Sequence, residues 1–190
     1  MIIALTGYKQ SGKSTVAKYL EENYGFVRVN FKDALVAEIT QNFSDLLAEI
    51  CCACDQDRPL PDRAWTEADL FELKPPLMRA LMVNYGTEVR RKDLNDYWVL
   101  KWESAIAKLC SSTNIVVDDC RFLNEETVIR KHGGKVIRVF RTDIQTGGNH
   151  TSETEQAQIA TDYVLESEPG AIFQLQQDVD VIMQNMLKFE

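Results

Sequence analysis

Apolar and polar residues alternate along this chain in blocks that predict strands and helices in turn. Short, unbroken apolar runs at 2–5 and 115–117 are typical of strands that are buried on both faces of a parallel sheet. A segment of alternating apolar and polar positions at 26–30 predicts a further short strand. With two more apolar runs, the pattern predicts strands over 2–5, 26–30, 115–117, 135–140 and 163–165.

Between these strands, apolar residues recur every three or four positions, which is the spacing of an amphipathic helix. Gly25 is suited to the position that follows a helix, and Gly86-Thr87 is expected to end another. Thr66, with Asp69 three residues later, predicts the capped start of a short helical turn. Helices are expected from about 12 to 24, 32 to 47, 77 to 85, 96 to 109, 124 to 132 and 171 to 189, with the short turn within 65–73.

Two stretches carry neither pattern. Residues 51–76 combine cysteines, charged residues and prolines, and are expected to be irregular. Residues 142–152 are polar and contain glycines, which predicts a mobile loop. Elsewhere the strands alternate with helices, which predicts an α/β fold with a parallel sheet and helices on both faces. We expect one domain over 1–190, with an irregular excursion at about 48–78 and a surface loop at about 142–153.

The segment 7–15 has the spacing G-x-x-x-x-G-K-[ST] and lies between a predicted strand and a predicted helix. That context is the one in which this spacing forms a phosphate-binding loop. Backbone N–H groups of such a loop point at phosphate oxygens, and the helix N-terminus adds its positive dipole end. Lys13 can reach the β- and γ-phosphates, and the Ser14 hydroxyl can bind Mg²⁺. The residues expected to hold nucleotide phosphates are Gly7, Ser11, Gly12, Lys13, Ser14 and Thr15.

Acidic and basic residues follow other predicted strands, at the edge of the sheet where ligands of such folds gather. Asp118 and Asp119 come directly after the strand at 115–117, where a carboxylate holds Mg²⁺ in phosphate-loop proteins, and one of the two is expected to do so. Arg121 and Arg79 are candidates to clamp a second substrate's phosphate. Arg141 follows the strand at 135–140, where it is a candidate to belong to a lid and to stabilise charge on the transferring phosphoryl group. The expected catalytic cations are therefore Lys13, Arg121 and Arg141.

Bulk properties narrow the class of partner. A length of 190 residues, of which 45% are hydrophobic, is enough for a proper core. The net charge of −8 argues against binding to nucleic acid, because the chain has no overall positive field. No apolar run reaches 18 residues and no signal peptide is evident, so we expect neither a membrane span nor export, and a cytoplasmic location.

The remaining side chains with possible chemistry have simpler explanations. The odd number of cysteines is not a disulfide framework, and the cluster at 51–54 lacks a second pair for zinc. Of the tryptophans, Trp102 is expected in the core, whereas Trp98 is a candidate to line a nucleoside pocket. We find no arrangement typical of nucleophilic catalysis. A phosphate monoester acceptor would need no general base, because it is already an anion, and catalysis would then be positioning and charge neutralisation.

With these residues in place, the chain resembles the bacteriophage deoxynucleoside monophosphate kinase family, which belongs with the nucleoside monophosphate kinases among phosphate-loop proteins. The resemblance runs in order through most of the chain. Its most specific block is 119–126, with the letters D-C-R-F-L-N-E-E, followed by 133–139 and Arg141. Further blocks are 7–15, 31–35, 79–81, 85–88, 97–99 and 150–153. Several relatives carry Asp where this chain has Ser14 and proline where it has Leu123, and residues 48–76 match poorly.

The resemblance implies ATP-dependent phosphorylation of a deoxynucleoside monophosphate to its diphosphate, with Mg²⁺, in a three-layer phosphate-loop NTP-binding fold whose lid is the loop at 142–153. It implies that Lys9 and residues 13–15 hold the phosphates of ATP, and that an arginine of the 48–78 excursion, Arg58 or Arg63, belongs to the monophosphate-binding segment. Analogy with the family favours a homodimer, and a phage origin would place the enzyme in the host cytoplasm. The residues implied to border the monophosphate are Lys32, Arg79, Gly86, Thr87, Trp98, Asp119 and Arg121.

Other activities fit part of the same pattern. A kinase of another small acceptor, such as dephospho-coenzyme A, would share the fold and differ in the acceptor that it turns over. A regulatory ATPase or GTPase switch would hydrolyse nucleotide without an acceptor, although the N-K-x-D type of guanine-reading motif is absent. A kinase of nucleic-acid ends is disfavoured by the net charge of −8.

Overall fold

The structure is a computed structural model that describes residues 1–143 and 151–188. Contacts between Cα atoms divide the chain into two compact units. Unit 1 comprises Met1–Phe31 and Trp102–Glu190, and unit 2 comprises Lys32–Lys101. That the two units form one domain stays a prediction.

Unit 1 is built on a five-stranded sheet in which all neighbouring strands are parallel, in the order β2-β3-β1-β4-β5. This confirms the predicted α/β class. The central strand β1 pairs Ala4 with Val117 on one side and with Val136 on the other. The segments that leave β1, β3 and β4 therefore emerge at one edge of the sheet. The strands are β1 (Ile2–Thr6), β2 (Val27–Arg28), β3 (Ile115–Val117), β4 (Lys135–Arg141) and β5 (Tyr163–Ser167).

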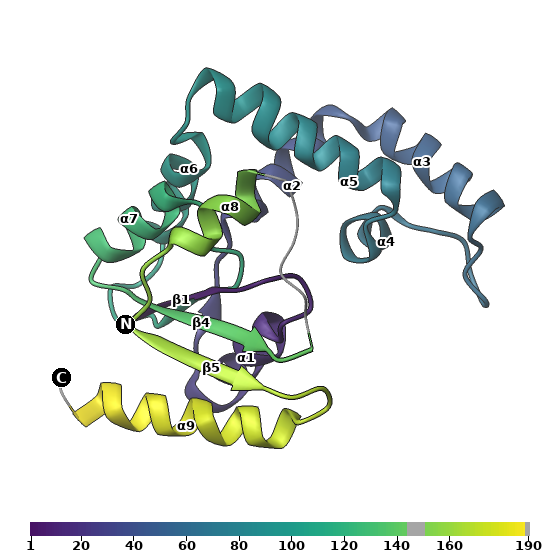
Figure 1. The fold of residues 1–190 in the computed structure, drawn as a ribbon. Coiled ribbons are helices and arrows are strands. Elements are labelled where there is room, and N and C mark those ends of the chain that lie inside the picture. The colour runs from purple at the N-terminus through teal and green to yellow at the C-terminus, as the bar shows by residue number, and fades with distance from the viewer. Residues whose placement is uncertain (144–150, 189–190) are drawn as a thin grey trace. The chain divides into compact units, whose positions relative to one another are not determined.

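Helices cover both faces of this sheet, as Figure 1 shows for the part of unit 1 around β1, β4 and β5. Helices α1 (Lys13–Tyr24) and α9 (Ile172–Lys188) pack together on one face. Helices α7 (Leu123–Lys131) and α8 (Thr151–Gln158) lie on the other, where α7 contacts β1 and β4. The main core lies between the sheet and the first pair, and it includes Ile3, Leu5, Val16, Leu20, Val116, Val139, Leu175, Val179 and Met183.

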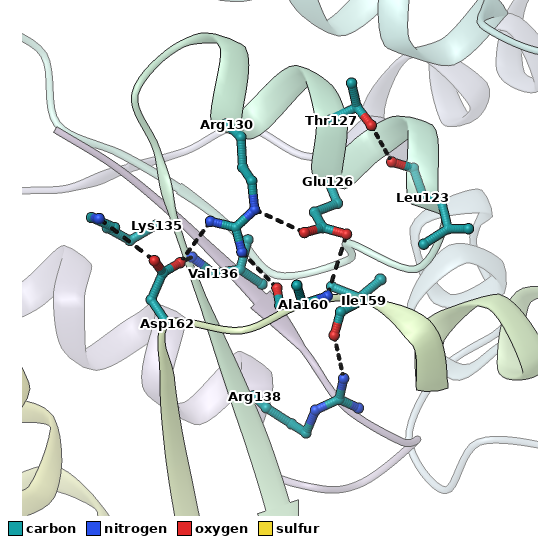
Figure 2. Close-up of polar contacts among 10 residues, drawn as sticks. All are labelled: Leu123, Glu126, Thr127, Arg130, Lys135, Val136, Arg138, Ile159, Ala160 and Asp162. Atoms are coloured by element: carbon teal, nitrogen blue, oxygen red, sulfur yellow. Dashed lines mark hydrogen bonds and ion pairs between the residues drawn. The ribbon is translucent and has the colours of Figure 1, made fainter.

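A network of polar side chains fastens α7 to the start of β5 (Figure 2). Arg130 on α7 forms an ion pair with Glu126 at 2.8 Å and another with Asp162 at 3.0 Å, and donates to the Ala160 carbonyl at 2.7 Å. Asp162 also accepts a hydrogen bond from the backbone N–H of Val136, at the start of β4. One arginine therefore holds the connection between α8 and β5 in place, which fixes the C-terminal end of α8.

Unit 2 is helical, and here three sequence expectations are wrong. The helix expected over 32–47 is broken at Phe43, which separates α2 (Phe31–Asn42) from α3 (Ser44–Asp57). The ring of Phe43 instead packs edge-on against Tyr85, with 5.1 Å between ring centres. The stretch expected to be irregular is helical as far as Asp57, because Leu47, Ile50, Cys51 and Cys54 form one buried stripe.

The third wrong expectation is a helix that ends at Gly86-Thr87. Helix α5 (Pro76–Val83) continues instead into a π-helix, η1 (Asn84–Arg91), before α6 (Tyr97–Ile106). Gly86 serves a close approach and not a stop, because a Cβ atom there would lie 3.2 Å from Cδ2 of Leu35. The helical turn expected near Thr66 is confirmed as α4 (Glu67–Leu73), with a capping box between Thr66 and Asp69.

The contact between α1 and α9 generates a prediction about stability in alkali. Tyr19 and Tyr24 both donate to the carboxylate of Asp180, Tyr24 at 2.7 Å. Burial, and then the hydrogen bond to Asp180, raise the pKa of Tyr24 from 10.0 to about 12. Tyr24 therefore contributes stability that is complete below its unfolded pKa and is lost as the pH rises through the folded value.

We expect the free energy of unfolding to fall between about pH 10 and pH 12, and to fall less in a Tyr24→Phe variant. Urea unfolding followed by circular dichroism across this range measures both curves. The difference between them isolates Tyr24 from the other tyrosines, and identical alkaline slopes would contradict the assignment.

Candidate functional site

The loop that joins β1 to α1 has the backbone of a phosphate-binding loop. Gly7 has a φ of 141°, Gln10 of 65° and Gly12 of 104°, so the loop turns through left-handed conformations three times. At Gly7 a side chain is impossible, because its Cβ would lie 2.1 Å from the carbonyl oxygen of Val139 in β4. Gly12 is the N-cap residue of α1 and has no side chain that could accept a hydrogen bond. The N–H groups of the first turn are therefore not capped by a side chain.

Polar groups inside the loop match what a chain of phosphates requires. The ammonium of Lys13 is buried and donates to the carbonyl oxygens of Gly7 and Tyr8, the latter at 2.6 Å. The hydroxyl of Ser11 is buried and has no hydrogen-bond partner among the described residues. Ser14 and Lys9 are exposed. A cation, an unpartnered hydroxyl and an uncapped helix N-terminus thus converge on one loop, which fits the binding of a phosphate group.

The two acids after β3 have different surroundings. Asp118 is 4% exposed, and its Oδ2 lies 3.1 Å from Nη1 of Arg28, which also contacts Glu21. Asp119 is less buried and accepts a hydrogen bond from the backbone N–H of Phe31 at 3.1 Å. Direct binding of Mg²⁺ by Oδ2 of Asp118 would compete with its ion pair to Arg28.

Arg121 lies exposed at the entrance to α7, and no described residue forms an ion pair with its guanidinium. Its backbone is fixed by Glu125, whose carboxylate accepts from the N–H groups of Arg121 and Phe122 at 2.8 and 3.1 Å. Glu125 is 2% exposed and holds the turn that presents Arg121. Glu125 is not among the site residues predicted from the sequence, although an acid three residues after a helix start is a capping signal.

Arg141 ends β4 and forms a two-contact ion pair with Asp143, at 2.6 and 3.2 Å. To stabilise charge on the transferring phosphoryl group, Arg141 would have to separate from Asp143. Most of the loop expected over 142–153, with His150, lies outside the described residues. Residues 151 and 152 were expected in that loop but begin α8, so the expectation is wrong for its last part.

The remaining predicted residues belong to unit 2. Lys32 lies in the first turn of α2, and Arg79 is exposed on α5. Gly86 and Trp98 are brought together, because the indole N–H of Trp98 donates to the Gly86 carbonyl at 2.9 Å. Trp98 is 3% exposed, so it supports the backbone next to Thr87 and offers no open ring face.

Of the two arginines from the 48–78 excursion, Arg63 is already engaged. It forms a two-contact ion pair with Asp69, at 2.6 and 2.7 Å, which holds the pKa of that carboxyl well below its usual range. No described residue pairs with the guanidinium of Arg58. Arg58 lines a pocket of unit 2 with Cys54, Asp57, Pro75 and Leu77.

The described residues hold neither a cluster suited to a metal ion nor a helix suited to cross a membrane. No three histidine, cysteine, aspartate or glutamate side chains of residues 1–143 and 151–188 gather in a group that could hold a metal ion. Within the same part of the chain, every helix is too short or too polar to cross a membrane.

Comparison with known proteins agrees with the loop geometry. No protein-family model matches the chain. A protein of Acanthamoeba polyphaga mimivirus, provisionally named a deoxynucleotide monophosphate kinase, is 28% identical over 177 residues, and the match covers 87% of each chain. The dephospho-CoA kinase of Fusobacterium nucleatum is 26% identical over 156 residues, which is 73% of this chain and 80% of that protein. The chain is homologous to phosphate-loop kinases.

Two solved structures align with nearly the whole chain. The dephospho-CoA kinase of Campylobacter jejuni aligns over 98% of this chain and 97% of its own, at 15% identity and a TM-score of 0.45. TT1252 of Thermus thermophilus aligns over 97% of both chains, at 18% identity and a TM-score of 0.48.

The loop geometry predicts that Gly7→Ala disables nucleotide binding. The added Cβ overlaps the Val139 carbonyl, so the loop must shift at a cost of about 2 kcal/mol or more. We expect a lower melting temperature and weak Mg-ATP binding by isothermal titration calorimetry.

Gly170→Ala is the matched control, because Gly170 also has a positive φ of 80° but a Cβ atom added there would have no other atom within 4 Å. That variant should lose about 1 kcal/mol for the backbone alone and keep its nucleotide affinity. Equal affinity in both variants would contradict the role given to the Gly7 contact.

Proposed function

We propose that this chain transfers the γ-phosphoryl group of ATP to a deoxynucleoside monophosphate and so forms the diphosphate. The observation that carries the proposal is a phosphate-loop geometry in a chain that aligns over 87% of its length with a relative provisionally named for this activity. The sequence blocks around Arg121 and Gly86 support the same choice of acceptor.

The reaction needs few chemical steps from the protein. An oxygen of the acceptor phosphate attacks the γ-phosphorus, and the bond from phosphorus to the β–γ bridging oxygen breaks, so that ADP leaves. The acceptor is already an anion, so no general base is required. Lys13 and the N–H groups of the loop neutralise charge on the transferring group, and Arg121 holds the acceptor phosphate. Catalysis is then positioning and charge neutralisation.

Magnesium fits the same loop. Ser14 is exposed in the first turn of α1, where a hydroxyl can bind the ion, and the acids after β3 supply the second position. When bound, the ion would offset negative charge on the phosphates. Of the two acids, we favour Asp119, because Asp118 is only 4% exposed and pairs with Arg28.

A second candidate acceptor is dephospho-coenzyme A, favoured by the relative from Fusobacterium nucleatum. That acceptor presents a hydroxyl group, which has to lose a proton, whereas a phosphate acceptor does not. The two proposals therefore differ in the acceptor and in the need for a base.

The proposal is tested by ADP release from Mg-ATP, with each deoxynucleoside monophosphate, each ribonucleoside monophosphate and dephospho-coenzyme A in separate reactions. We expect stimulation by one or more deoxynucleotides over a reaction without acceptor. Stimulation by dephospho-coenzyme A alone would favour the second candidate. Equal release in every reaction would show a nucleotide hydrolase and contradict both.

Lys13→Ala should abolish phosphoryl transfer, because the buried ammonium is the loop's own countercharge. Its circular dichroism spectrum should stay that of a folded chain. A folded variant with near-normal turnover would rule out the loop as the phosphate site.

Arg121→Ala should raise the KM for the acceptor by about a hundredfold, the loss expected for a charged hydrogen-bonded pair, with the KM for ATP nearly unchanged. Lys108→Ala, which removes another exposed cation, is the control and should change neither constant. An unchanged acceptor KM would remove Arg121 from the pocket.

A further inference from the structure

A single carboxylate in unit 2 gathers donors from two other elements. Glu38 on α2 accepts hydrogen bonds from the hydroxyls of Tyr85 and Tyr97, and forms ion pairs with Arg90 at 3.0 Å and Lys101 at 3.3 Å. The side chain of Glu38 is only 14% exposed. Tyr85 and Arg90 belong to η1, and Tyr97 and Lys101 to α6. The carboxylate thus ties the π-helix to both neighbouring helices.

The pairing of Tyr85 with Arg90 depends on the π-helical winding. These residues are five apart, and in an α-helix they would be separated by about 140° around the axis. A π-helix bonds residues five apart, which brings them onto one face. Here Nη2 of Arg90 lies 2.6 Å from the hydroxyl of Tyr85, and its guanidinium carbon lies 5.0 Å from the centre of the Tyr85 ring.

The π winding is uncommon and needs support from the surrounding structure. Glu38 gives that support, because it contacts both members of the five-residue pair. Burial tends to raise the pKa of Glu38, but the hydrogen bonds from Tyr97 and Tyr85, together with Lys101 and Arg90, hold that pKa below its ordinary value. The carboxylate is therefore charged at neutral pH and remains a partner for both cations.

Gly86 and Thr87 lie inside the segment that this network holds. The backbone of Gly86 passes so near Leu35 that an added Cβ would lie 3.2 Å from that side chain, and the Gly86 carbonyl accepts the indole N–H of Trp98. A change from π to α winding would rotate Gly86 and Thr87 away from these contacts. Both residues thus lie between Tyr85 and Arg90, the two residues of the π-helix that Glu38 contacts.

We propose that Glu38 is a positioning residue for the acceptor: it maintains the π-helix at Asn84–Arg91 and so fixes the backbone of Gly86 and Thr87, which the family resemblance assigns to the monophosphate. This inference rests on the proposed function for the identity of the ligand, but not for the winding of η1. Glu38 touches neither substrate nor reacting atoms in this account.

The first test is the kinetics of Glu38→Gln, which keeps the side-chain size and removes the charge. We expect the acceptor KM to rise about tenfold, with kcat and the KM for ATP within about twofold of the native values. Glu103→Gln is the matched control, because it breaks an ion pair with Lys131 and changes a hydrogen bond with His132 in unit 1. It should leave all three constants unchanged, and an equal rise in both variants would overturn the proposal.

A second measurement reads the winding without any substrate. In Glu38→Gln, the backbone amides of 84–91 should exchange with deuterium at least about tenfold faster than in the native chain, whereas those of α9 should not change. Arg90→Gln should act on the same network, so the double variant should be no worse than the worse single variant. Native exchange rates at 84–91 in Glu38→Gln would overturn the proposal, even if no acceptor is turned over and the proposed function has failed.

Discussion

The carbonyl oxygen of Val139 stands so close to Gly7 that no side chain fits between them. This contact is a result of the sheet order, which places β4 directly beside β1. Because the backbone of the loop passes against β4 there, it turns back sharply and delivers Lys13 into the first turn of α1. The loop and the start of α1 are thus held against β4 by one close backbone approach.

Away from the loop, charged side chains hold segments of the chain in place. Arg130 fastens the connection before β5 in unit 1, and Glu38 fastens the π-helix in unit 2. In each case one partly buried side chain contacts several donors or acceptors, and removing it would leave those groups without that partner. Such groups specify which local geometry is adopted. Arg121 depends in the same way on buried Glu125.

Much of the sheet and the phosphate loop could be predicted from the sequence, because apolar runs and the glycine spacing are local signals. The helix α3 was missed because its buried stripe includes Cys51 and Cys54, whose apolar character was hidden by the charged residues that follow. The π-helix was missed because Gly86 is a typical helix end, and its contact with Leu35 is tertiary. The ion pair of Asp118 with Arg28 joins residues 90 positions apart, so no local pattern could reveal it.

The winding of the π-helix also affects how the chain would accommodate the gain or loss of one residue. A π-helix uses more residues for each turn than an α-helix, so an α-helix that gains one residue can absorb it as a π turn without rotating the helical faces on either side. The segment Asn84–Arg91 therefore has a winding that holds one residue more than an α-helix would between the flanking helices. With one residue fewer between Tyr85 and Arg90, the two side chains would be four apart, and a plain α-helix would keep them on one face.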